Sequence, residues 1–157
     1  QACVTCVIPC LNECENLRVL LPLLRSRLAA LCSGWEIIVA DDGSTDGTEA
    51  LMAEWTQYDG FRYVQLSRNF GKEAALSAGL ESATGDVVIC MDADMQHPPA
   101  LIEQMLARWA AGAEMVYAVR ETREDESWIS ARVRAGSTNC SAAPVAWMYP
   151  PMPAIFA

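Results

Sequence analysis

Short apolar runs alternate along the chain with segments in which apolar residues recur at helical spacing. Five runs rich in Val and Ile are predicted strands: Val4–Ile8, Glu36–Ala40, Phe61–Leu66, Asp86–Met91 and Glu114–Val119. Their apolar residues are nearly continuous, which is typical of strands buried on both faces of a parallel sheet. Strands that alternate with helices predict an α/β fold with a mostly parallel sheet flanked by helices.

Four helices are predicted between these strands. They are the leucine-striped segment from Leu17 to Leu31, a segment after Ser44–Asp46, one that starts near Lys72, and one that follows Pro98 and Pro99. A proline at a helix start supports the last of these. Pro22 lies inside the leucine stripe and is expected to kink or split the first helix.

The last part of the sequence differs from the rest. All 20 acidic residues lie at or before Glu126, and four of the eight prolines fall between Pro144 and Pro153. No helical or strand period follows Arg134. We therefore expect one domain over residues 1–130, truncated at its C-terminal side, and an atypical, poorly ordered tail over residues 131–157.

Composition narrows the classes of function. A formal charge of -9 with a single lysine disfavours binding to nucleic-acid phosphates, so no nucleic-acid partner is expected. No run of 18 apolar residues is present, so no transmembrane helix is predicted in this chain. There is no secretory signal pattern, and Gln1 in place of Met suggests that the chain is processed, cut or missing its first residues. Seven cysteines, an odd count, favour a reduced, intracellular chain.

Four of the cysteines form a C-x2-C-x3-C-x3-C run, at Cys3, Cys6, Cys10 and Cys14. Such a run can indicate an iron–sulfur or zinc site. Cys3 and Cys6 fall in a predicted strand, however, where residues three apart point to opposite faces and cysteine behaves as a small apolar residue. A structural role is therefore preferred.

A segment rich in polar residues follows every predicted strand. The five segments are Pro9, Asn12 and Glu13; Asp41, Asp42, Gly43 and Ser44; Arg68 to Lys72; Asp92 to His97; and Arg120 with Arg123. Ligands of open parallel sheets bind outside the carboxyl ends of the strands, so one site at this edge is predicted. The Asp-Asp-Gly-Ser segment has a second interpretation, a turn that caps the next helix.

The residue types indicate the chemistry of this site. Asp92 and Asp94 offer hard oxygen ligands for Mg²⁺ or Mn²⁺, although a lone D-x-D pair occurs often by chance. Such an ion usually completes its shell with water and substrate phosphates. The nearby cations that would hold the remaining phosphate charge are Arg68, Lys72, Arg120 and Arg123. Acids and cations around one ion predict a substrate that carries a diphosphate.

Four blocks of the sequence resemble a known family. They are Val7–Leu17, Asp41–Thr48, Arg68–Ala75 and Gly85–Pro99. In order and spacing, over about residues 3 to 130, they resemble the inverting family 2 glycosyltransferases of GT-A (Rossmann-like) fold. Within that family they are most similar to polyprenyl-phosphate glycosyltransferases, that is, bactoprenol glucosyltransferases and dolichol-phosphate mannosyltransferases.

The resemblance implies roles for individual residues. The nucleotide-binding residues would be Pro9, Asn12, Glu13, Asp41, Asp42, Arg68, Lys72 and Asp92. The metal ligands would be Asp94, Gln96 and Asp92, and the catalytic residues Asp92, Asp94, Arg120 and Arg123. Within these sets, Asp42 would contact the base, and Arg120 and Arg123 would receive the acceptor phosphate or the diphosphate.

The resemblance also implies an activity: inverting transfer of a hexose from a nucleotide sugar to a polyprenyl (bactoprenyl) phosphate. A phosphate monoester is already anionic at neutral pH and needs no strong general base. UDP-glucose is preferred over GDP-mannose as donor. The expected location is cytoplasmic, at the cytoplasmic face of the inner membrane for the full-length protein. Family members continue with amphipathic and often membrane-spanning helices.

Three alternative functions predict other sequence patterns or another outcome. A phosphoacceptor receiver domain would place its acidic residues after the first and third strands rather than the second and fourth. A metal-dependent nucleotidyltransferase would have a basic, glycine-rich loop after the first strand, which Pro9–Glu13 is not. The non-enzyme alternative is an incomplete nucleotide-sugar-binding fragment that lacks the acceptor site.

Overall fold

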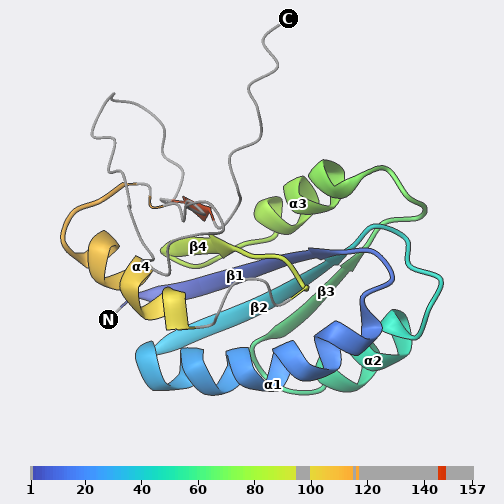
Figure 1. Cartoon of the computed structure of the whole chain (residues 1–157), viewed down its shortest axis with the longest axis horizontal. Helices are drawn as coiled ribbons and strands as arrows, with labels where there is room; N and C mark the ends of the chain where they lie inside the picture. The colour runs from blue at the N-terminus through green and yellow to red at the C-terminus, as the bar shows by residue number, and fades with distance from the viewer. Residues whose placement is uncertain (1, 95–99, 115, 117–144, 148–157) are drawn as a thin grey trace, which may run out of the picture.

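The computed structural model describes residues 2–94, 100–114, 116 and 145–147. A parallel sheet in the order β3-β2-β1-β4-β5 forms its centre (Figure 1). The strands are β1 Cys3–Cys10, β2 Gly34–Asp41, β3 Phe61–Gln65, β4 Val87–Cys90 and β5 Val145–Trp147. The helices are α1 Cys14–Leu31, α2 Thr48–Trp55, α3 Lys72–Glu81 and α4 Ala100–Ala110.

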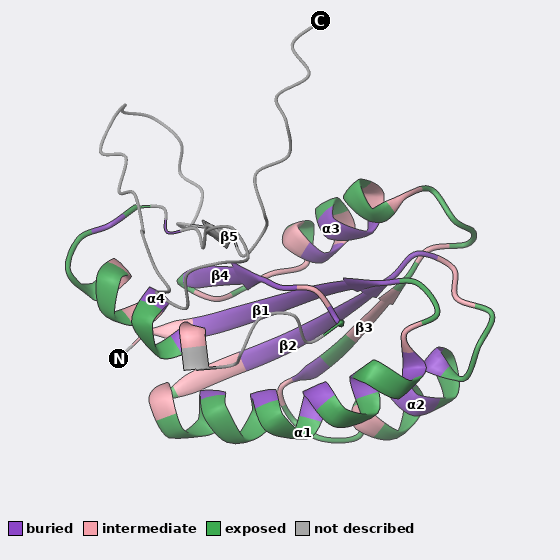
Figure 2. Cartoon of the chain, in the orientation of Figure 1, coloured by how far each residue is buried: buried purple, intermediate pink, exposed green. Residues whose placement is uncertain are grey.

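Helices cover both faces of the sheet (Figure 1). Buried side chains of α1, α2 and α4 form one apolar cluster with one face, to which β1 contributes Val4, Cys6 and Ile8. On the opposite face, Leu76 of α3 packs with Val7 of β1 in a second cluster. The central strands are therefore buried on both sides, as Figure 2 shows, which explains their continuous apolar sequences.

Most of the predicted elements are confirmed. The first four predicted strands correspond to β1–β4, and the four predicted helices to α1–α4. Of the fifth predicted strand, Glu114–Val119, the structure describes only Glu114 and Val116, so this prediction lies mostly outside the described residues. A strand after Arg134 was not expected, yet β5 pairs with β4, Val88 opposite Val145. A three-residue strand is too short to show a periodic pattern.

The prediction that Pro22 splits the first helix is wrong, because α1 runs unbroken from Cys14 to Leu31. Proline removes the hydrogen bond to the carbonyl four residues earlier, here that of Arg18. Both residues are exposed, so water can reach the carbonyl that is left unpaired.

The strand order decides where a ligand can bind. β1 lies between β2 and β4, so the connections that follow β1 and β4 diverge at their carboxyl ends. In open α/β sheets this point, where the strand order reverses, is the usual binding crevice. Across the ranges described above, no helix is long and apolar enough to cross a bilayer.

Candidate functional site

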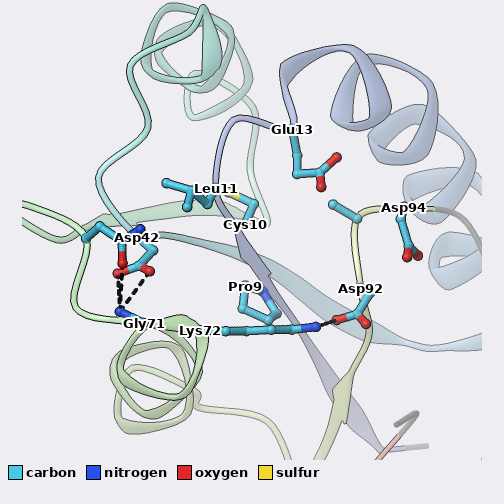
Figure 3. A pocket seen from close by; sticks show the side chains of 11 residues that line it. Pro9, Cys10, Leu11, Glu13, Asp42, Gly71, Lys72, Asp92 and Asp94 are labelled. Carbon is cyan, nitrogen blue, oxygen red and sulfur yellow. Dashed lines mark hydrogen bonds and ion pairs between the residues drawn. The ribbon is translucent and has the colours of Figure 1, made fainter. Parts of the chain in front are cut away.

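A cavity of about 340 Å³ opens at the carboxyl ends of β1, β2 and β4 (Figure 3). Its lining comes from four segments far apart in the sequence: Pro9, Cys10, Leu11 and Glu13; Asp42; Asn69, Gly71 and Lys72; and Asp92, Ala93 and Asp94. The cavity thus lies at the divergence of the β1 and β4 connections, and residues from four of the five predicted polar segments meet there.

The loop after β4 supplies the D-x-D pair. Asp92 Oδ1 lies 2.7 Å from Nζ of Lys72, the first residue of α3. The Asp92 side chain is 18% exposed, whereas that of Lys72 is 50% exposed. Figure 3 shows the lysine reaching across the cavity from α3 to this carboxylate. The first Asp of the motif is thus held in place by an ion pair.

Asp42 fixes the loop between β3 and α3. Its Oδ1 accepts a hydrogen bond of 2.8 Å from the Phe70 amide, and its Oδ2 one of 2.9 Å from the Gly71 amide. Gly43 allows the segment after β2 to lie close to this loop, because a Cβ at Gly43 would lie 2.6 Å from the Arg68 carbonyl carbon. Asp42 also lines the cavity, and Oδ2 retains a lone pair for a base N–H.

The loop after β1 forms another wall. Pro9 and Cys10 end the buried run of β1, and Leu11 is 38% exposed at the cavity. Glu13 directly precedes α1, and its Oε2 accepts a hydrogen bond of 2.5 Å from Asn16 Nδ2. An apolar side chain and a carboxylate beside each other suit a ligand with a flat ring and hydroxyl groups.

The described lining is strongly anionic. It contains four carboxylates, Glu13, Asp42, Asp92 and Asp94, against one ammonium group, that of Lys72. A diphosphate would be repelled from such a cavity unless a cation came with it. The described residues contain no group of three or more acidic, His or Cys side chains that could hold a metal by themselves. Two carboxylates fit an ion that takes its other ligands from phosphates and water, as Mg²⁺ usually does.

Three of the predicted nucleotide-binding residues do not line the cavity. Asn12 has φ 55°, and its Oδ1 accepts a hydrogen bond from the Thr45 amide. Asp41 is fully buried and accepts hydrogen bonds from Ser44 and from the Tyr63 hydroxyl. These contacts favour the alternative role of the second segment as a turn.

The third of these residues is Arg68, whose guanidinium stacks on the exposed ring of Phe70 at 4.7 Å. Gln96, Arg120 and Arg123 lie outside the described residues, so their predicted roles stay predictions.

The sequence did not reveal the role of Asp46. Its Oδ2 accepts a hydrogen bond from the Cys14 amide and its Oδ1 one from the Thr48 amide, so a single carboxylate caps the starts of α1 and α2. Burial raises the pKa of Asp46, but the hydrogen bonds from Thr48 and Cys14 outweigh it and lower the pKa below its usual value. The only signal in the sequence was that Asp46 directly precedes a predicted helix.

The cysteine run forms no metal centre among the described residues. Cys6, Cys10 and Cys14 are buried in the apolar cluster under α1. Burial raises the pKa of the Cys6 and Cys10 thiols, which keeps them neutral. All six cysteines that the structure describes are free thiols.

Comparison with known proteins identifies the family. Residues 5–152 match the family described as glycosyl transferase family 2. The chain belongs to this family. The match extends beyond residue 130, the limit predicted from the sequence, and includes β5.

Two relatives have similar sequences. An uncharacterized glycosyltransferase of Synechocystis sp. is 44% identical over 124 residues, which cover 78% of this chain and 39% of the relative. An undecaprenyl-phosphate 4-deoxy-4-formamido-L-arabinose transferase of Pseudomonas fluorescens is 41% identical over 128 residues, 80% of this chain and 38% of the relative. The family 2 chain therefore spans less than half the length of these relatives.

A solved structure has a similar fold. It is a mannosyltransferase of Pyrobaculum calidifontis in complex with GDP-Man and Mn²⁺, with a TM-score of 0.64 and 26% identity. The alignment covers 79% of this chain and 36% of that one. The GT-A fold predicted from the sequence is confirmed.

Proposed function

We propose that this chain carries the donor-binding half of a glycosyltransferase that moves a sugar from a nucleotide sugar to a polyprenyl phosphate. One observation carries the proposal: an anionic cavity at the β1/β4 divergence, with Asp92 and Asp94 on one wall and Lys72 on the opposite side. A nucleotide sugar brings a diphosphate, which binds there together with a divalent cation.

In this proposal each wall of the cavity holds one part of the donor. Leu11 and Pro9 lie against the base, and Asp42 Oδ2 accepts a hydrogen bond from it. Asp92 and Asp94 would hold the cation, whose charge would offset that of the departing diphosphate. Lys72, at the start of α3, contributes a positive charge to the same phosphates.

The acceptor is proposed to be a polyprenyl phosphate. The name of the Pseudomonas fluorescens relative supports this class, and it specifies a formamido-arabinose as the sugar. An anionic phosphate oxygen can attack the anomeric carbon directly, so a single displacement inverts the configuration. Arg120 and Arg123 are proposed to hold this acceptor phosphate. The donor remains UDP-glucose in our proposal, with GDP-mannose and a 4-formamido-arabinose nucleotide as the alternatives to be tested.

Replacement of Asp94 tests the donor site. In Asp94→Ala, metal-dependent donor binding is expected to be abolished, a greater loss than the ~10–100-fold that follows loss of a residue supporting a metal ligand. Isothermal titration of UDP-glucose, GDP-mannose and the arabinose donor, with Mn²⁺ and again with EDTA, provides the measurement. Glu15→Gln is the matched control, because the Glu15 side chain is 91% exposed on α1. Equal donor binding by wild type and Asp94→Ala would contradict the proposal.

A second candidate is a donor-binding chain without transfer activity. The described lining of the cavity provides for a donor and its cation, which such a chain would bind equally well. Incubation of the chain with donor, Mn²⁺ and a polyprenyl phosphate in detergent separates the two. Formation of a glycosylated lipid with inverted anomeric configuration supports the transferase, whereas donor binding without product supports the second candidate.

A further inference from the structure

Lys72 and Asp92 form an ion pair within the lining of the cavity. Oδ1 of Asp92 is shielded from solvent, and among the described residues no hydrogen-bond donor other than Lys72 reaches it. A buried carboxylate oxygen needs a positive partner, because its loss of hydration is otherwise uncompensated. Lys72 supplies that charge at 2.7 Å.

The position of Lys72 is set by the loop before it. Asp42 anchors the Phe70 and Gly71 amides, and Gly71 turns the chain with φ 105° directly before α3 begins. The backbone of Lys72 is thus fixed by the helix and by Asp42. Its side chain is half-exposed and carries its ammonium on a flexible four-carbon stem. The charged end can therefore move while its base stays in place.

We propose that Lys72 is a positioning residue that occupies the cation's side of Asp92 while the cavity holds no donor. When a divalent cation and a nucleoside diphosphate bind together, the ammonium leaves Asp92 and pairs with a phosphate oxygen of the diphosphate. The inference rests on the proposed donor site and adds to it an exchange of partners by one residue.

Charge explains why the exchange requires both ligands. A divalent cation alone must displace the ammonium from Asp92 and leave it near a second cation. A diphosphate alone meets four carboxylates, while the one cation of the described lining is already paired. Together the ligands give each charge an opposite partner. The cation and the nucleotide should therefore strengthen each other's binding by the same factor.

The variant Lys72→Met removes the ammonium and keeps a side chain of similar length. Mn²⁺ alone should bind this variant about 5- to 10-fold more tightly than wild type, the range expected for loss of one half-exposed opposing charge. The factor by which UDP tightens Mn²⁺ binding should fall by at least as much, because Lys72 no longer contributes to holding the diphosphate. Electron paramagnetic resonance of free Mn²⁺, with and without UDP, measures both quantities on the whole chain.

Two control variants make the experiment specific. Lys72→Arg keeps the positive charge and should bind Mn²⁺ alone like wild type. Arg27→Met makes the same change in net charge at an exposed residue of α1, outside the cavity lining. It should leave binding of Mn²⁺ alone within about twofold of wild type, since exposed charges at a distance are screened. Circular dichroism checks that each variant is folded.

The outcomes separate this inference from the proposed function. If UDP tightens Mn²⁺ binding but Lys72→Met binds Mn²⁺ alone no better than wild type, the exchange is wrong and the donor site stands. An equal gain in the affinity for Mn²⁺ alone in Lys72→Met and Arg27→Met would also overturn the exchange, since only overall charge would then matter. If neither wild type nor Lys72→Met binds Mn²⁺ with or without UDP, GDP or the arabinose nucleotide, both proposals fall.

Discussion

At the scale of single residues, the role of each carboxylate in this chain depends on the groups around it. Asp92 and Asp94 line the cavity, whereas Asp41 and Asp46 accept hydrogen bonds that hold loops and helix starts in place. Asp41 and Asp42 are adjacent residues of the same type at the end of a predicted strand. The sequence therefore could not show which of them lines the cavity and which stabilises the turn. The difference comes from the Tyr63 hydroxyl on the neighbouring strand, a contact that depends on strand pairing.

Glu36 belongs to the structural group and lies away from the cavity. Its Oε1 accepts hydrogen bonds from the Thr5 hydroxyl at 2.6 Å and from the Thr84 amide at 2.7 Å. Burial raises the pKa of Glu36, but these hydrogen bonds and that from Arg62 outweigh it and lower the pKa below 4.5. This carboxylate joins β1, β2 and β3 to the segment before β4.

The lowered pKa predicts how stability depends on pH. The ionised form of Glu36 is favoured by folding, so its contribution is complete above the unfolded-state pKa of 4.5 and is lost as pH falls through the lower folded-state pKa. Glu36→Gln should lower the free energy of unfolding by about 1–3 kcal/mol at pH 7 and flatten the acid side of the stability curve. Urea unfolding between about pH 3.5 and pH 7 measures both effects. If the free energy of unfolding fell as steeply with decreasing pH in Glu36→Gln as in the Glu15→Gln control, this role of Glu36 would be contradicted.

At the scale of elements, the sequence predicted strands and helices well because each has one strong local signal. Continuous Val and Ile identified β1, β2 and β4, and the leucine stripe identified α1. Local pattern could not predict β5, whose three residues are defined by pairing with β4. Nor could it predict that α1 continues past Pro22, since that depends on which side of the helix meets water.

The packing of α3 gives a prediction at this scale. A Cβ at Gly79 would lie 2.4 Å from Val7 Cγ1 and 3.2 Å from Ala40 Cβ. Gly→Ala within a helix normally gains up to ~1 kcal/mol. Here the clash with β1 should cost about 1–3 kcal/mol, so Gly79→Ala is expected to destabilise the protein.

The neighbouring side chain provides the control for that prediction. If contact with Val7 causes the loss, Gly79→Ala should cost less in a Val7→Ala background than in wild type. A double-mutant cycle by urea unfolding gives this coupling. Additive effects of the two substitutions would show that the clash does not determine the cost.

At the scale of the whole molecule, the site is an outcome of topology. The sequence predicted that polar segments meet at one edge of the sheet, and four of the five segments contribute residues to the cavity. It did not predict that the cavity centres on β1 and β4, because strand order cannot be read from local periodicity. The ion pair between Lys72 and Asp92 likewise joins two segments whose separation in space depends on that order.

The anionic cavity predicts how ligands affect stability. Donor nucleotide together with Mn²⁺ should raise the free energy of unfolding, by about 2.7 kcal/mol when the donor is at 100 times its Kd. Either ligand alone should give a much smaller increase, because the lining carboxylates repel a lone diphosphate. Thermal unfolding with each ligand, with both, and with EDTA measures the effect, and Asp94→Ala should show none. The same shift from nucleotide in EDTA would contradict the need for a cation.

The central place of β1 has a consequence for how the site is made. The Cys3 amide and the Asp86 carboxylate, 83 residues apart in sequence, are joined by a hydrogen bond beside the β1–β4 pairing. During synthesis, the first half of the cavity leaves the ribosome long before β4 can pair with β1. A nascent chain should therefore not retain donor nucleotide until the segment through Asp94 has emerged and paired. Ligand capture would then mark the moment at which β4 pairs with β1, and could be used to time that step in stalled chains of increasing length.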